Sequence, residues 1–341
     1  MPRTTRSTPR SRGRFASPPS TLGLLSLLAW VSLLGCSAEG GEPSATGQGG
    51  SEPAGLPTPA SVLAPSSYDC TATGPFLAPE RPHATDCFAE ASCTSPLVAA
   101  HRIATPFAPE NSLSALRAAI LLGVDVAESD VRLTQDGEVV LLHDAEVDRT
   151  LVGRGKIDEL TLAEVRAMEM KSDGKPGDFS CDRLPTLAEA LALAGDEIVV
   201  ELEVKNTAAG VKTAEYLRDH DGYRRAFLLC DPDECDAVRA AVPDVPIMTR
   251  PRAPDEVAAA VGYAPPPELV HIDATEGFLT PEILGAIAGA GAKPYANAFL
   301  NADLAALGSG KIDGYLELYA SGLGVVQTEL PHAVLMALSR L

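Results

Sequence analysis

The sequence predicts an α/β protein built as a TIM-type (β/α)8 barrel. From residue 97 onward, short apolar runs alternate with stretches of helical periodicity, which is the pattern of a parallel α/β fold. Charged residues follow several of the apolar runs, as they do at the carboxyl-terminal rim of such a barrel. The span 96–341 also has the typical length of this fold, about 250 residues.

Nine apolar runs are candidate strands, and eight helical patterns accompany them. The strands are expected at 97–103, 125–132, 139–143, 197–205, 226–230, 246–250, 268–273, 293–298 and 324–328. The helices are expected at 111–122, 161–170, 186–195, 210–219, 233–241, 254–262, 280–290 and 331–340, and Asn111, Thr161, Thr186 and Thr280 are their clearest start signals. Nine strands are one too many for the barrel, so one of them is peripheral. An open doubly wound sheet is the alternative fold, although no Gly-rich phosphate loop follows the first strand.

The first 35 residues have the three-part layout of an export signal. Five arginines within residues 1–14 precede the apolar stretch 22–34, which is too short to span a membrane comfortably. The letters LLGC, ending at Cys36, resemble a bacterial lipobox, which implies cleavage before Cys36 and acylation of its thiol. We therefore expect an exported, lipid-anchored protein of the cell envelope. An uncleaved anchor or an ordinary signal peptide is the alternative.

The chain is strongly acidic, with a formal net charge of −19 at pH 7. This charge argues against nucleic acid as a partner and against electrostatic docking on an anionic bilayer. Residues 36–67 are rich in Gly, Ser, Ala, Pro and Thr and are expected to form a flexible tether. Residues 68–96 form an irregular, Cys-containing lead-in, and the barrel follows at 97–341.

Six cysteines remain besides Cys36, and an even number in an exported protein favours disulfides. Cys230 and Cys235 can close a small loop. A bridge from the lead-in, which holds Cys70, Cys87 and Cys93, to Cys181 would fasten that segment to the barrel. Six cysteines allow 15 pairings, and the sequence does not choose among them.

Ionisable residues follow the apolar runs between residues 97 and 144. His101 follows LVAA and His143 follows VVLL, and an imidazole can accept and donate protons near neutral pH. Glu128 and Asp130 lie two apart on a predicted strand and so share one face. Two neighbouring carboxylates raise each other's pKa unless a cation lies between them, and a hard divalent ion prefers oxygen ligands. Structural histidines and salt bridges to Arg132 or Lys205 are the alternative interpretation.

The run IVVELEVK at 198–205 places Glu201, Glu203 and Lys205 on one face of a strand. Charges that point into a barrel must be paired or functional. We interpret Glu203 as a third metal ligand and Lys205 as a cation for phosphate oxygens. Glu201 is left over, as a supporting group or as a partner of Lys205.

Other polar residues flank this set. Arg102 and Arg149 are candidate phosphate contacts, and Glu110 can reach the site from the first loop. Asp144 can orient His143 or cap the loop that follows. Asn111 is interpreted as a helix cap.

Taken in order, these residues resemble the glycerophosphodiester phosphodiesterase family. The resemblance rests on HRIATPFAPENSL at 101–113, ESDVRLTQDGEVVLLHD at 128–144, RT followed by GRGKIDELTLAEV within 149–165, LPTLAEAL at 184–191 and ELEVK at 201–205. The family usually reads HRG where this chain has Ile103, so we expect a different first loop. The match is weaker beyond residue 205, in the strands that usually shape the alcohol pocket.

The resemblance implies hydrolysis of glycerophosphodiesters to glycerol phosphate and an alcohol, with one divalent cation, Mg²⁺ or Ca²⁺. It implies that His101 and His143 are the acid–base pair, that Glu128, Asp130 and Glu203 bind the metal, and that Arg102 and Lys205 contact phosphate. The expected partners are therefore a small glycerophosphodiester and, through the lipid anchor, a membrane. A sphingomyelinase D-like lyase that forms a cyclic phosphate, or a catalytically silent envelope binding protein, are the alternative functions.

Overall fold

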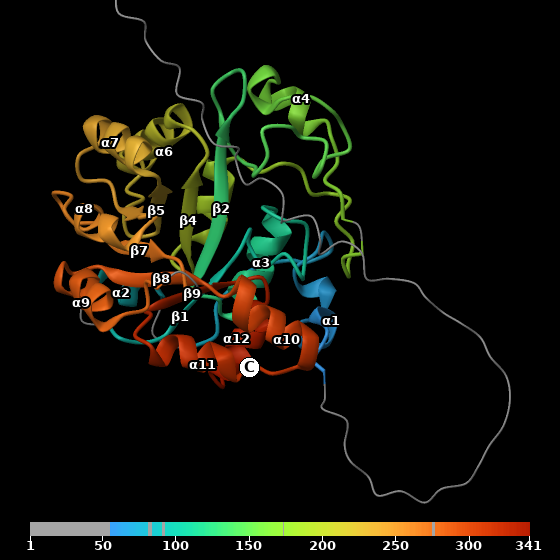
Figure 1. The fold of residues 1–341 in the computed structure, drawn as a ribbon. Helices are drawn as coiled ribbons and strands as arrows, with labels where there is room; N and C mark the ends of the chain where they lie inside the picture. The colour runs from blue at the N-terminus through green and yellow to red at the C-terminus, as the bar shows by residue number, and fades with distance from the viewer. Residues whose placement is uncertain (1–54, 81–83, 91–92, 173, 275–276) are drawn as a thin grey trace, which may run out of the picture. The chain divides into compact units, whose positions relative to one another are not determined.

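A closed barrel of eight parallel strands forms the centre of the structure, a computed structural model that describes residues 55–341 except 81–83, 91–92, 173 and 275–276 (Figure 1). The strands are β1 (Leu97–Ala100), β2 (Val126–Leu133), β4 (Val199–Val204), β5 (Ala226–Cys230), β6 (Ile247–Thr249), β7 (Leu269–Ile272), β8 (Lys293–Asn297) and β9 (Val325–Thr328). Each pairs in parallel with its neighbours, and pairing of β1 with both β9 and β2 closes the ring. The expected TIM-type fold is confirmed.

The ninth predicted strand is the peripheral one. This strand, β3 (Val139–Leu141), runs antiparallel to β2 at the edge of the barrel. The chain between β3 and residue 186 packs over a small apolar core of its own, which includes Val140, Leu151 and Val165. The hairpin of β2 and β3 therefore extends the rim of the barrel without adding to the ring.

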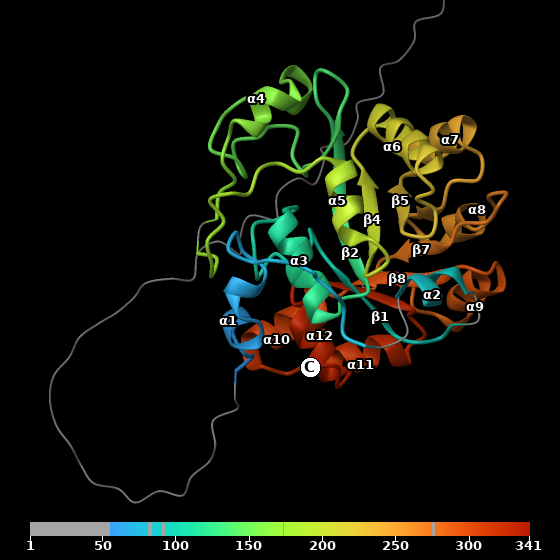
Figure 2. The same ribbon diagram turned by 180° about the vertical axis from the view of Figure 1, so that it is seen from behind.

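Helices cover the outside of the barrel, as both views show (Figures 1 and 2). The longer ones are α3 (Leu113–Leu122), α5 (Leu187–Ala194), α6 (Thr207–Asp219), α7 (Pro232–Ala241), α9 (Pro281–Gly289), α11 (Asp313–Ala320) and α12 (Pro331–Ala337). Shorter ones are α1 (Pro59–Val62), η2 (Pro65–Ser67), α2 (Ala84–Ala89), η3 (Ile157–Glu159), α4 (Leu162–Arg166), η4 (Pro254–Glu256), α8 (Val257–Ala260), η5 (Phe299–Asp303) and α10 (Leu304–Ser309). Each helix expected from the sequence is present, and the helices between 299 and 320 were not expected.

Local chemistry explains where several helices begin. Thr161 and Thr186 form capping boxes with Glu164 and Glu189, as their spacing predicts. The interpretation of Asn111 as a cap is wrong, because Ser112 caps α3 by accepting a hydrogen bond from the backbone N–H of the third helical residue. Asn111 is therefore free to take part in the site described below.

Side chains inside the barrel change from apolar to charged along the strands. Leu97, Val126, Val199, Leu269 and Val325 belong to one buried cluster at the amino-terminal ends of their strands. Helix α2 from the lead-in joins this cluster, and its Phe88 ring stacks on Phe227 of β5 at a centroid distance of 5.0 Å. Because successive side chains of a strand alternate between faces, the inward positions two and four residues further on reach the carboxyl-terminal rim.

Three disulfides fasten the described chain. Cys70 bonds to Cys181, Cys87 to Cys93, and Cys230 to Cys235. The expected small loop and the expected bridge from the lead-in to Cys181 are both confirmed. Cys36 and most of the predicted tether lie outside the described residues, and within those residues no helix is long and apolar enough to cross a bilayer.

Candidate active site

The two strands that carry the predicted metal ligands are neighbours in the barrel. In the register of β2 against β4, Glu128 pairs with Glu201, and Asp130 pairs with Glu203. All four are inward positions, and Asp130 and Glu203 lie nearer the carboxyl-terminal ends of their strands than Glu128 and Glu201 do. His101 directly follows β1, which pairs with the other edge of β2.

The carboxylates of Glu128, Asp130 and Glu203 converge. One oxygen of each lies within 4.8 Å of the others, and Glu128 and Asp130 are 1% and 0% exposed. Among the described residues, Oε1 of Glu128 has no hydrogen-bond partner. Burial, followed by the charge of Asp130, raises the pKa of Glu128 well above its usual value. A buried oxygen without a partner, aimed into a cluster of acids, fits a ligand for a hard divalent cation.

Positive side chains balance the other two acids of the trio. Lys205 Nζ lies 2.8 Å from Asp130 Oδ1 and 3.1 Å from Glu203 Oε2. Arg250 Nη2 lies 3.1 Å from the second oxygen of Glu203. Burial opposes ionisation of Glu203, but the charges of Lys205 and Arg250 outweigh it and hold its pKa at about 2. Glu203 is therefore ionised, as a metal ligand must be.

Asn111 fixes the orientation of Asp130. Its amide nitrogen donates to Asp130 Oδ2 at 2.9 Å, and its amide oxygen accepts from the hydroxyl of Ser129 at 2.8 Å. Asn111 is 2% exposed and adopts φ 56°, a left-handed conformation that asparagine tolerates better than most residues. The role of Asn111 is thus to hold a candidate ligand in place.

His101 lies between two carboxylates. Its Nδ1 is 2.7 Å from Glu329 Oε1, and its Nε2 is 3.9 Å from Glu128 Oε2. Burial alone would lower the pKa of His101, but the hydrogen bond with Glu329 and the charge of Glu128 outweigh it, so the pKa is raised. Because an ionised carboxylate only accepts, Nδ1 carries the proton, and Nε2 faces the acid trio.

The loop after His101 makes an unusual left-handed turn. Arg102, Ile103 and Ala104 have φ values of 47°, 59° and 49°. Such values are unfavourable for residues with a Cβ, above all for a β-branched one. The turn directs the backbone N–H of Arg102 to Glu128 Oε2 at 2.7 Å. Ile103 therefore adopts a backbone conformation that glycine would adopt with less strain, and the turn supports a candidate ligand.

The second histidine and its neighbours form a chain of charges at the rim. His143 Nδ1 lies 2.7 Å from Asp144 Oδ1, and Arg149 donates to the other oxygen of Asp144. Arg149 also holds Glu110 with two hydrogen bonds of 2.6 and 2.8 Å, and Arg102 lies 3.3 Å from the same carboxylate. Burial lowers the pKa of His143. Asp144 thus orients His143, whereas Arg149 and Arg102 contact acids in this structure.

Glu201 is held by a residue that the sequence did not single out. Its carboxylate is fully buried, and the Tyr295 hydroxyl donates to Oε2 at 2.6 Å. Burial raises the pKa of Glu201 to about 8. Glu201 therefore lies one inward position before Glu203 on β4 as a largely neutral acid, and it does not pair with Lys205.

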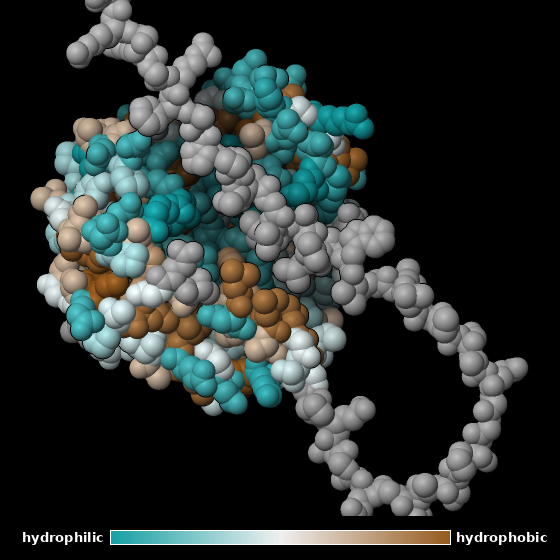
Figure 3. All heavy atoms as spheres, in the orientation of Figure 1, coloured by the Kyte–Doolittle hydropathy of each residue, from teal (hydrophilic) through white to brown (hydrophobic). Residues whose placement is uncertain are grey.

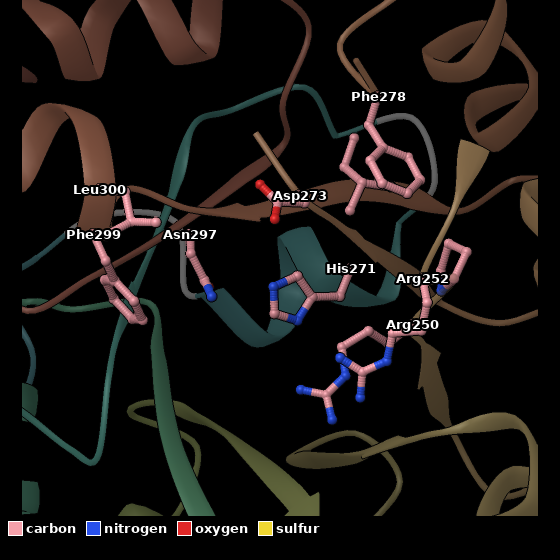
Figure 4. A pocket seen from close by; sticks show the side chains of 10 residues that line it. Arg250, Arg252, His271, Asp273, Phe278, Asn297, Phe299 and Leu300 are labelled. Carbon is pink, nitrogen blue, oxygen red and sulfur yellow. The ribbon is translucent and has the colours of Figure 1, made fainter. Parts of the chain in front are cut away.

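Next to the trio the rim opens into a cavity of about 350 Å³ (Figure 4). Its polar lining residues are Arg250, Arg252, His271, Asp273 and Asn297, and Phe278, Phe299 and Leu300 are among its apolar ones. Phe299 also packs on His101, with ring centroids 4.8 Å apart. Arg250 and Phe299 therefore join the cavity to both the trio and the histidine.

The face drawn in Figure 3 is hollowed and hydrophilic in its middle, and hydrophobic residues gather beside the hollow. Leu300, Leu304 and Leu307, on η5 and α10, are among the exposed large apolar side chains of the described chain. The rim therefore has a polar interior and an apolar flank on the side of η5.

The sequence of the barrel matches one family of enzymes. Residues 101–270 match the profile of the glycerophosphoryl diester phosphodiesterase family. A glycerophosphodiester phosphodiesterase of Caldanaerobacter subterraneus is 41% identical over 112 residues, which are 32% of this chain and 45% of that protein. Human glycerophosphodiester phosphodiesterase 1 is 40% identical over 94 residues, 27% of this chain and 28% of that protein. The chain thus spans less than half the length of these curated relatives.

Solved structures extend the likeness of fold to the whole barrel. A glycerophosphodiester phosphodiesterase from Agrobacterium tumefaciens superimposes with a TM-score of 0.60 at 21% identity, covering 70% of this chain and 99% of that one. An Oleispira antarctica phosphodiesterase, solved with the product sn-glycerol-3-phosphate, superimposes with a TM-score of 0.59 at 25% identity. The superposition covers 73% of this chain and 99% of that one.

Proposed function

Since residues 101–270 match the profile of the glycerophosphoryl diester phosphodiesterase family, we propose that this protein hydrolyses glycerophosphodiesters to glycerol phosphate and an alcohol. The observation that carries the proposal is the convergence of three carboxylates from β2 and β4 at one rim of the barrel. Relatives with the same name and a neighbour that holds glycerol phosphate support this reaction.

Glu128, Asp130 and Glu203 would hold one divalent cation, Mg²⁺ or Ca²⁺. When bound, the cation offsets negative charge that develops on the phosphate and orients the diester. Lys205, which bridges Asp130 and Glu203, would contact a phosphate oxygen beside the cation. Arg102 would add a second positive contact from the first loop. These groups would hold the diester at the rim, beyond Glu201 along β4.

His101 and His143 would divide the proton transfers. One accepts the proton of the attacking water, and the other donates a proton to the departing alkoxide. Each has Nδ1 occupied by a carboxylate, Glu329 or Asp144, at 2.7 Å. This arrangement fixes the orientation of each ring and leaves Nε2 for the substrate.

The test is hydrolysis of glycerophosphocholine, glycerophosphoethanolamine and glycerophosphoglycerol by the full chain, followed by phosphorus NMR with and without EDTA. We expect glycerol phosphate that disappears when the cation is removed. A cyclic phosphate would instead support a lyase. No cleavage of any diester would leave a binding protein and contradict the proposal.

We also propose that the chain is exported and anchored to the cell envelope by a lipid on Cys36. The support is the arginine-rich start, the apolar stretch 22–34 and the LLGC sequence. Mass spectrometry of the mature protein should find an acylated N-terminal cysteine. Replacement Cys36→Ser should release the protein into the soluble fraction, and an unmodified wild-type Cys36 would refute the anchor.

A further inference from the structure

We propose that the cavity beside the trio binds the leaving alcohol and selects a neutral, polyhydroxylated head group over a quaternary ammonium group. This inference rests on the proposed hydrolysis and specifies its substrate class. The cavity meets the site at two points: Arg250, which contacts Glu203 at 3.1 Å, and Phe299, which packs on His101. An alcohol attached to a phosphate at the trio would therefore extend into it.

Two polar atoms in the cavity wall need a partner. Among the described residues, Oδ1 of Asn297 and Nδ1 of His271 are buried without a hydrogen bond. His271 is 7% exposed, and burial lowers its pKa to about 3, so the ring is neutral. Figure 4 shows both side chains facing the same space. Unpaired buried polar atoms are costly, and a ligand that pairs them gains affinity for that reason.

A hydroxyl group satisfies both kinds of atom, because it donates and accepts. Asn297 Oδ1 requires a donor, and a ring nitrogen of neutral His271 can be matched by either role of a hydroxyl. A trimethylammonium group has no N–H or O–H and would leave Asn297 Oδ1 unpaired. A head group with several hydroxyls is therefore the better complement to this wall.

The small number of aromatic rings in the cavity lining supports the same head-group preference. Arg250 and Arg252 line the cavity, and both contact Asp231, Arg250 at 3.1 Å and Arg252 at 2.6 Å. Recognition of a quaternary ammonium group usually relies on a cage of aromatic faces. In the part of the lining that the structure describes, the aromatic side chains are those of His271, Phe278 and Phe299, and two guanidinium groups lie among them. Asp231 balances much of the charge of the two guanidinium groups, and Asp273 also lines the cavity. A quaternary ammonium group would thus meet few aromatic faces and no aromatic cage.

The experiment compares kcat/KM for glycerophosphoinositol, glycerophosphoglycerol and glycerophosphocholine. We expect the two polyol diesters to exceed the choline diester by about tenfold or more, the discrimination that an unpaired buried acceptor provides. The variant Asn297→Ala should lose most of this preference by lowering kcat/KM for the polyol diesters alone. Asn301→Ala, four residues further on in η5 and outside the cavity lining, is the matched control and should keep the preference.

Arg252→Gln provides a second test if Asn297→Ala does not fold, because this side chain is 57% exposed. Arg252→Gln should raise kcat/KM for the choline diester relative to kcat/KM for the polyol diesters. A wild-type preference for choline would overturn the inference. An equal loss of kcat/KM for all three diesters in Asn297→Ala would also overturn the inference, because the cavity would then hold the glycerol that the diesters share. If wild-type cleaves none of them, the proposed function fails, and calorimetric binding of the same diesters then decides the head-group preference separately.

Discussion

Replacing Glu128 with glutamine should make the cation-free protein more stable and the cation-bound protein less stable. Glu128 is the member of the trio with an oxygen that has no partner among the described residues, whereas Asp130 and Glu203 are paired with Lys205. Two unit charges within 4.8 Å of each other would repel by about 3 kcal/mol at an effective dielectric constant of 20, and the raised pKa of Glu128 relieves part of this repulsion because the carboxyl takes up a proton. The nearby cations offset part of this repulsion, so we expect a gain of about 1–2 kcal/mol in the free energy of unfolding.

Glutamine keeps an oxygen that can accept the hydrogen bond from the Arg102 N–H, so the first loop should be preserved. In EDTA the variant should melt about 2–6 °C above wild-type. With a divalent cation at about 100 times its Kd, wild-type should gain about 2.7 kcal/mol, and Glu128→Gln should gain much less. The order of the two melting temperatures should therefore invert.

The assay is thermal unfolding followed by circular dichroism, first in EDTA and then in excess Mg²⁺ or Ca²⁺. Glu138→Gln is the matched control, because Glu138 lies exposed in the turn between β2 and β3 and outside the trio. It should shift neither curve. The reasoning is refuted if Glu128→Gln destabilises the protein in EDTA, or if the variant gains as much from the cation as wild-type does.

Three other predictions concern catalysis, pH and the lead-in. His101→Ala and His143→Ala should each lower kcat by at least about 100-fold while the circular dichroism spectrum is unchanged, and full activity in either would contradict the acid–base roles. Burial lowers the pKa of His332 from 6.5 to about 4, so the unfolded state takes up the proton first as the pH falls. Wild-type should therefore lose about 3 kcal/mol of stability between pH 6.5 and pH 4 in urea titrations, and His332→Gln should lack this part of the loss. Replacing Cys70 and Cys181 together by serine should cost about 3–5 kcal/mol in the same titrations, because the disulfide closes a loop of 111 residues, and an unchanged midpoint would show that the lead-in is held by packing alone.

Much of the barrel could be predicted because its strands are short and strongly patterned. Each strand lies within a range given by an apolar run, except that β2 extends one residue beyond it, and the run at 198–205 shows its inward face directly through Glu201, Glu203 and Lys205. Parallel neighbours in register then bring Asp130 opposite Glu203. The trio could be predicted because its residues alternate along strands, and that alternation is a local property of the sequence.

The partners of these residues could not be predicted, because closure of the barrel decides them. Glu329 and Arg250 are single charges at the ends of short strands, and nothing in their local pattern distinguishes them from surface charges. Their contacts with His101 and Glu203 join residues 228 and 47 positions apart. Tyr295 likewise finds Glu201 from 94 positions away.

The helices between residues 299 and 320 could not be predicted because their apolar residues do not follow the spacing of a helix with one buried face. Leu300, Leu304 and Leu307 are exposed, so the apolar residues of η5 and α10 do not mark one buried face. A buried polar network holds this segment instead. Asp303 accepts hydrogen bonds from the hydroxyls of Tyr315 and Thr328, at 2.6 Å each, and from the backbone N–H of the residue after Thr328. Such a network depends on distant residues and leaves no periodic pattern in the sequence.

The most direct test of this account is calorimetric titration of the full chain with Mg²⁺ and with Ca²⁺. The account predicts that wild-type binds one ion per chain and that Glu203→Gln binds the ion with much lower affinity. Glu203 is the ligand that β4 contributes, whereas Glu128 and Asp130 come from β2. An affinity that Glu203→Gln leaves unchanged, or hydrolysis that continues in a wild-type protein shown to hold no ion, would contradict it.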